Sequence, residues 1–123
     1  MVNSKEASFA YLETLSDEQL CAACQLGNRN AEEVLAARYH RLVRSIARPY
    51  FLAGGDNEDL LQEGMVGLIK AMREYDPHQA ASFCTFAEVC IRRRLYSVLK
   101  SASSGKHQPL NQAIPLNPSF FDV

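Results

Sequence analysis

Apolar residues recur every three or four positions along most of the chain, and no segment alternates apolar and polar residues as a half-buried strand would. This pattern predicts an all-α fold, a compact bundle of about four helices. Ser16, with Gln19 three positions later, is typical of a helix start, and Gly27 is typical of a helix end. The first predicted helix lies between them.

The second predicted helix begins at Asn30, a capping residue with the acidic Glu33 at the third position after it. Pro49 predicts an end or a kink near Arg48, because proline lacks the backbone donor that a helix interior needs. Between these limits the apolar positions are Val34, Leu35, Tyr39, Leu42, Val43 and Ile46.

Two further helices are predicted in the second half of the chain. The third spans about residues 58–74, after a Gly-Gly break and a capping Asp56. Its small residues Gly64 and Gly67 would let neighbouring helices approach. The fourth begins after a capping Ser82 and runs to about Ser103.

The two ends of the chain show no such periodicity. We predict a flexible N-terminal arm over residues 1–14, a helical domain over 15–105, and an interdomain linker or tail over the proline-rich residues 106–123. A chain of 123 residues with 47% apolar residues can form one modest core. No apolar run approaches the roughly 20 residues that cross a bilayer, and the first residues lack the order of a signal peptide. We therefore expect a cytoplasmic protein without a membrane partner.

The net charge of −1 hides an uneven distribution. Acidic residues outnumber basic ones up to Ala80, whereas the segment from Ala81 onward is basic. Its bases are Arg92, Arg93, Arg94, Lys100 and Lys106, and its only acids are Glu88 and Asp122. A basic segment on an acidic body predicts two partners, one of them anionic, and nucleic acid is the first candidate.

Little in the sequence favours catalysis or metal binding. Cys21 and Cys24 form a C-x-x-C pair, but the pair lies inside a helical pattern without a nearby histidine. Cys84 and Cys90 are six residues apart, which is not the spacing of a zinc knuckle. We interpret the cysteines as small buried helix residues, and keep a metal or thiol-redox module as an alternative. No catalytic residue, cofactor or metal site is predicted, and we expect a protein that is not an enzyme.

The third predicted helix has more apolar surface than one small core needs. At about 100° per residue, the core stripe is followed by a second stripe with an apolar centre and a polar rim, as protein docking sites often have. Arg73 is also on this second stripe, and the candidate partner-binding residues are Asp59, Gln62, Val66 and Ile69, with Glu63 beside them. The alternative is a helix covered on two sides within its own bundle.

The fourth predicted helix combines aromatic and basic side chains. Basic groups neutralise phosphates, and aromatic rings stack on unpaired bases. The candidate nucleic-acid-binding residues are Phe83, Phe86, Arg92, Arg93, Tyr96 and Lys100. The alternative is a solvated basic face with two core phenylalanines, and three consecutive arginines cannot all face one ligand.

Several ordered motifs resemble region 2 of the bacterial sigma-70 family. Residues 58–71 look like the family's D-L-x-Q-E-G-x-x-G-L-x-x-A signature, and residues 75–77, 83–87 and 91–92 are similar to its F-D-P, F-S-T-Y-A and I-R elements. The resemblance covers about residues 15–111. Two short segments, residues 86–91 and 106–111, look most like sigma-H type factors of spore-forming bacteria.

The resemblance implies a transcription initiation factor that binds core RNA polymerase and melts the minus-ten promoter element. The stripe on the third helix would dock on the clamp coiled coil of the largest polymerase subunit. The fourth helix would hold the non-template single strand, with Arg92, Arg93 and Lys100 along the backbone and Phe83, Phe86 and Tyr96 for support or stacking. An anti-sigma factor is a further candidate partner. A regulator that docks on polymerase without opening promoters is the alternative.

The chain departs from the family pattern at two places. Primary factors carry adjacent tryptophans where this chain has Val89 and Cys90, and the glycine that usually precedes the F-S-T element is replaced within Gln79-Ala80-Ala81. These differences favour an alternative factor with stricter promoter demands. Full factors of this type continue into a helix-turn-helix domain that reads the minus-thirty-five element, and the last residues here resemble the linker before it.

Overall fold

The computed structural model describes residues 4–52 and 57–104, and within these ranges all regular structure is α-helical. The all-α prediction is therefore confirmed, with one helix more than expected. The helices are α1 (Ser4–Leu12), α2 (Asp17–Gln25), α3 (Arg29–Leu52), α4 (Asn57–Glu74) and α5 (Phe83–Ser104).

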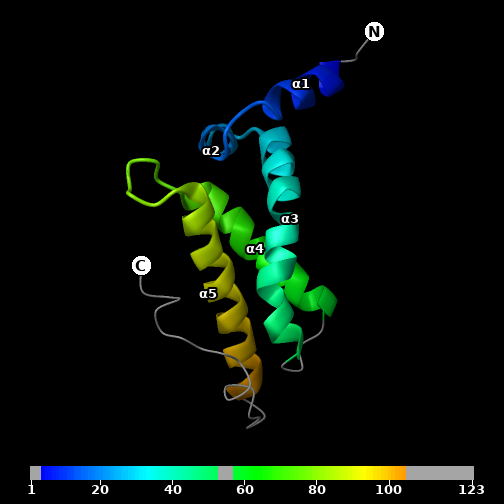
Figure 1. The fold of residues 1–123 in the computed structure, drawn as a ribbon, viewed down its shortest axis with the longest axis vertical. Coiled ribbons are helices and arrows are strands. Elements are labelled where there is room, and N and C mark those ends of the chain that lie inside the picture. The colour runs from blue at the N-terminus through cyan, green and yellow to red at the C-terminus, as the bar shows by residue number, and fades with distance from the viewer. Residues whose placement is uncertain (1–3, 53–56, 105–123) are drawn as a thin grey trace.

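The three long helices form the body of the domain (Figure 1). α4 packs most extensively against α5 and then against α3, while α2 lies over one end of the three and α1 contacts α3 beyond it. Side chains from α2, α3, α4 and α5 meet in one core. Its largest fully buried members are Phe83, Leu20, Leu35, Leu68, Met72, Ile91, Leu95 and Val43.

Two glycines on α4 permit this close packing, as the sequence predicts. A Cβ added at Gly64 would lie 2.6 Å from Cγ1 of Val43 on α3. A Cβ added at Gly67 would lie 3.0 Å from Cβ of Arg94 and 3.1 Å from the Cys90 carbonyl oxygen on α5. These distances are shorter than ordinary van der Waals contacts, so the absence of a side chain at these two positions sets how near α3 and α5 come to α4.

Three of the predicted helix boundaries are confirmed by hydrogen bonds. Ser16 and Gln19 form the reciprocal capping box at the start of α2. Gly27 has a φ of +96°, which a residue with a side chain rarely adopts, and its N–H donates to the Cys24 carbonyl as the helix closes. The Ser82 hydroxyl accepts the Thr85 N–H at the start of α5.

The predicted cap at Asn30 is wrong, because Asn28 caps α3 instead. Its Oδ1 accepts the Ala31 N–H at 3.1 Å, and its own N–H donates to the Ala23 carbonyl at the end of α2. One residue thus closes one helix and opens the next, so the connection is shorter than the sequence suggests. The other predicted cap, Asp56, and the predicted tail over residues 106–123 lie outside the described residues.

Of the two effects predicted for Pro49, an end of the helix near Arg48 is wrong, because α3 continues to Leu52 with Pro49 inside it, and a kink there stays a prediction. Ile46, Ala47 and Tyr50 are buried on one face of this segment. Continuing the helix keeps Tyr50 in the core, and the free energy gained by burying this side chain offsets the loss of the backbone hydrogen bond that proline cannot make.

The segment predicted as an N-terminal arm contains α1. This helix has no clear amphipathic pattern. Leu12 is buried and Phe9 is half-buried against the core. A nine-residue helix is marginal alone, so packing on α3 supplies what local propensity does not.

Candidate protein and nucleic-acid surfaces

The predicted partner-binding stripe lies on the outer face of α4. Asp59 and Gln62 are exposed, Ile69 is half-buried, and Val66 is 44% exposed although α4 packs on both α3 and α5. α4 is therefore covered on two sides, as the alternative expects, but Val66 lies outside that packing. Apolar surface left at the centre of a polar stripe is suited to docking a protein.

A groove of about 370 Å³ runs beside this stripe. The groove is lined by the apolar side chains of Val66 and Ile69 and by the charged side chains of Lys70, Arg73 and Glu74. The prediction placed Arg73 on the stripe but did not include Lys70 or Glu74. Lys70 follows Val66 by four residues and Glu74 follows Lys70 by four, and this helical spacing is the signal that could have found them.

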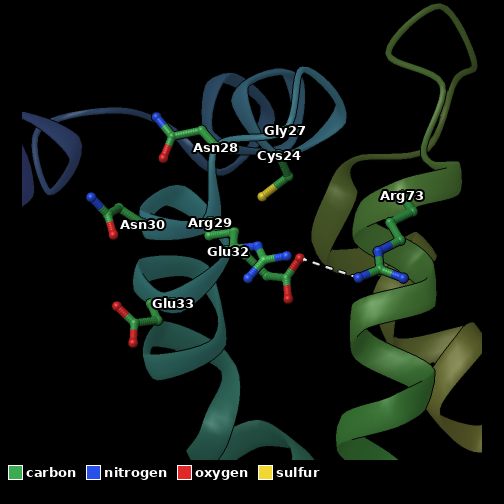
Figure 2. Close-up of a pocket in the computed structure, with 8 residues that line it drawn as sticks. All are labelled: Cys24, Gly27, Asn28, Arg29, Asn30, Glu32, Glu33 and Arg73. Carbon is green, nitrogen blue, oxygen red and sulfur yellow. Dashed lines mark ion pairs between the residues drawn. The ribbon is translucent and has the colours of Figure 1, made fainter.

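Arg73 also borders a second, more polar groove of about 590 Å³ between α4 and the junction of α2 with α3 (Figure 2). Its guanidinium lies 3.7 Å from the Glu32 carboxylate across this groove. The remaining lining comes from Cys24 and from residues 27–30 and 33. The two grooves therefore meet at one side chain, which ties the end of α4 to the start of α3.

Glu63 is joined to α5 by a salt bridge that the sequence analysis did not foresee. Its Oε1 accepts a hydrogen bond from Nε of Arg94 at 2.8 Å, and Nη2 of Arg94 lies 2.6 Å from the same oxygen. Both side chains remain partly exposed. The surface of α4 is therefore continuous with one edge of α5.

The nucleic-acid candidates on α5 divide into a surface group and a core residue. Arg93 and Lys100 are exposed, and Phe86 and Tyr96 are partly exposed. Spacings of three, four and seven residues place these four on one face of the helix. Nζ of Lys100 lies 5.9 Å from the centre of the Tyr96 ring, within the range of a cation–π contact. This face offers both phosphate-binding and base-stacking groups.

Phe83, in contrast, lies in the core. It is fully buried, and its ring makes edge-on contacts with Tyr39 at 5.3 Å and Tyr75 at 5.5 Å between ring centres. The Phe86 ring also packs against the Tyr75 ring, with 5.7 Å between the ring centres. Direct stacking of a base on Phe83 would require the core to open. Of its two predicted roles, support of the surface is the one that this burial favours.

Arg92 lies at the opposite edge of α5 from Arg94. It is partly buried, and its Nη2 lies 3.4 Å from the Glu88 carboxylate one turn earlier. Burial raises the pKa of the Tyr50 phenol on α3, and the nearby Arg92 charge opposes that rise. Arg92 is thus held toward α3, whereas Arg93 and Arg94 are exposed.

The cysteines do not resemble a thiol-redox site. All four are free thiols. Burial raises the pKa of Cys21 to about 12, and it also raises the pKa of Cys24 and of Cys90, so these thiols stay protonated at neutral pH. Among residues 4–52 and 57–104, no cluster of three histidine, cysteine or acidic side chains is arranged to hold a metal ion.

No helix among the described residues has the length and apolar character needed to span a membrane. The domain is instead a helical module with two neighbouring surfaces of different chemistry, one on α4 and one on α5. Comparison with known proteins identifies the family of this module. A profile for sigma-70 region 2 matches residues 35–104, and the chain belongs to the sigma-70 family.

Individual relatives agree with this assignment. The chain is 42% identical over 108 residues to the RNA polymerase sigma-H factor of Bacillus subtilis and 41% identical over 108 residues to that of Bacillus licheniformis. These matches cover 88% of this chain but only 50% and 48% of the two relatives, so the chain spans about half of their length. It is also 44% identical over 69 residues to the sigma factor FliA of Pseudomonas aeruginosa, covering 52% of this chain and 27% of that protein. No solved structure gives a significant match. The predicted likeness to sigma-H type factors is confirmed.

Proposed function

We propose that this domain docks on core RNA polymerase through α4 and holds the melted non-template strand of the minus-ten promoter element along α5. It performs no covalent chemistry in this role. It favours promoter opening by exchanging base stacking within the duplex for contacts between unpaired bases and the protein, which must offset a few kcal/mol for each extruded base.

The exposure of Val66 is the observation that carries the docking half of the proposal. Val66 lies at the centre of a stripe whose rim is Asp59, Gln62 and Glu63, and the stripe borders a groove of about 370 Å³. An apolar centre with a polar rim matches the composition of transient protein interfaces. The names of the relatives, which are RNA polymerase sigma factors, indicate polymerase as the partner.

The nucleic-acid half rests on the outer face of α5. Arg93 and Lys100 supply positive charge there, and Tyr96 supplies a partly exposed ring between them. Stacking on aromatic rings does not depend strongly on the identity of the base, and phosphate contacts give affinity. Such a face is suited to an unpaired strand, because the bases of a closed duplex are not available for stacking.

Binding of the chain to purified bacterial core RNA polymerase tests the docking half. We expect Gln62→Ala combined with Glu63→Ala to weaken binding at least tenfold while the circular dichroism spectrum stays unchanged. Glu33→Ala combined with Gln79→Ala removes the same side-chain types from exposed positions outside α4 and serves as the matched control. Equal binding by both double variants would show that α4 is not the docking face.

The DNA half is tested in the polymerase complex with single-stranded minus-ten DNA. Tyr96→Ala should cost about 1–3 kcal/mol of DNA affinity, and Tyr96→Phe should retain most of it because the ring remains. A complex that binds a scrambled strand equally well would instead support the regulator that docks without opening promoters.

A further inference from the structure

We infer that Arg94 belongs to the polymerase-docking surface and not to the nucleic-acid surface, so that docking uses a composite of α4 and one edge of α5. The inference rests on the proposed function and extends its docking site to a residue of the basic cluster. It also specifies the chemistry that the partner must present there.

The three consecutive arginines of α5 point in three directions, because successive helical residues are about 100° apart. Arg92 pairs with Glu88 and lies near Tyr50 on the α3 side. Arg93 is exposed on the outer face of α5. Arg94 is paired with Glu63 of α4.

The backbone of α4 fixes where Arg94 lies. Gly67 has no Cβ, and a Cβ built there would be 3.0 Å from Cβ of Arg94, so the base of the Arg94 side chain rests directly on α4. Glu63 precedes Gly67 by four residues and therefore lies on the same face one turn away. From its anchored base, the Arg94 guanidinium extends along α4 to the Glu63 carboxylate.

The ion pair with Arg94 orients the Glu63 carboxylate and leaves part of it exposed to a partner. The contacts of Arg94 described above are made at Oε1, and the Glu63 side chain is still 31% exposed. A carboxylate already held in one rotamer loses less conformational entropy when a partner binds it. Arg94 therefore acts as a positioning residue for Glu63.

Arg94 also presents its own charge to the partner. Its side chain is 43% exposed, and the hydrogen bond to Glu63 uses one of the five N–H donors of a guanidinium. A partner surface that was only basic would be attracted to Glu63 and repelled by Arg94. The complementary surface must therefore place a hydrogen-bond donor opposite Glu63 and a carboxylate or carbonyl oxygen opposite Arg94.

Matched substitutions at the two neighbouring arginines test this assignment. Each full-length variant is measured for affinity to core RNA polymerase and, at saturating polymerase, for affinity to single-stranded minus-ten DNA. We expect Arg94→Gln to weaken polymerase binding about fivefold or more, with DNA affinity changed less than twofold. Arg93→Gln should show the opposite pattern.

Thermal unfolding followed by circular dichroism shows whether Arg94→Gln is still folded. If this variant unfolds early, Arg94→Lys keeps the charge but not the planar guanidinium, and it should give a smaller loss of polymerase binding with the same selectivity. Polymerase binding by the Arg94 variants equal to the parent, or a greater loss of DNA binding than in Arg93→Gln, would overturn the inference. Failure of the parent chain itself to bind polymerase would instead overturn the proposed function, and this inference with it.

Discussion

The carboxylate of Glu18 on α2 accepts a hydrogen bond from the backbone N–H of Phe83, the first residue of α5, with 3.0 Å between Oε2 and the nitrogen. The first N–H groups of a helix have no partner within it, and a negative charge is stabilised at that end. This contact spans 65 residues of sequence and holds the start of α5 against α2. It thereby fixes the helix that carries the proposed nucleic-acid surface.

Replacing Glu18 should destabilise the domain measurably. We expect Glu18→Ala to lower the free energy of unfolding by about 1.5–3 kcal/mol, the usual contribution of a hydrogen bond to a charged group. Urea unfolding monitored by circular dichroism measures the change. Glu33→Ala removes an exposed carboxylate from the first part of α3 and should stay within about 0.5 kcal/mol of the parent. Similar values for the two variants would contradict the role given to Glu18.

Gly64→Ala should destabilise the protein although alanine favours helices. The added methyl group would lie 2.6 Å from Cγ1 of Val43, so α3 and α4 must shift apart or Val43 must change rotamer. Overpacking costs about 1–3 kcal/mol and the gain in helix propensity returns about 1 kcal/mol, which predicts a net loss of up to about 2 kcal/mol in urea unfolding.

A second variant separates this steric conflict from a general effect of the substitution. Val43→Ala alone leaves a cavity in the core, because Val43 is fully buried. Combined with Gly64→Ala, it removes the carbon that the new methyl group meets, so the double variant should be more stable than the sum of the single losses predicts. Additive losses would show that the two positions do not compete for the same space.

Ionisation of Cys21 should make the protein less stable as the pH rises. The folded state holds the thiol proton with a pKa of about 12, against an ordinary value of 9.0, because the thiol is buried. Between these values the unfolded chain holds less of the Cys21 proton than the folded one, so this thiol lowers the free energy of unfolding above pH 9 by at most about 1.4 kcal/mol per pH unit. This stability is fully present below pH 9.

Urea unfolding at intervals from pH 8 to pH 10.5 measures that slope. Cys21→Ala removes the titrating thiol and should flatten the curve relative to the parent, even if it lowers the stability at pH 8 by leaving a small cavity. Cys84→Ala is the control, because Cys84 is exposed at the start of α5. An unchanged slope in Cys21→Ala would show that another group causes the loss.

Local sequence signals determined most of the helices of this protein. The capping residues Ser16 and Ser82, the left-handed Gly27 and the spacing of apolar residues act within a turn or two of the chain, so they can be recognised without knowing the fold. The ordered motifs of residues 58–92 likewise identified the family that the comparisons confirm. The solvent-facing stripe of α4 follows from the same local periodicity.

Contacts between residues far apart in the sequence determined the remaining features of the fold and the site, and no local sequence pattern predicts these contacts. The helix α1 and the continuation of α3 through Pro49 depend on burying Leu12 and Tyr50 in a core that other helices complete. Phe83 and Phe86 look alike in sequence, but the rings of Tyr39 and Tyr75 enclose only Phe83 completely. Which of three adjacent arginines faces Glu63 likewise depends on how closely α5 approaches Gly67, which is a property of the packed helices and not of either segment alone.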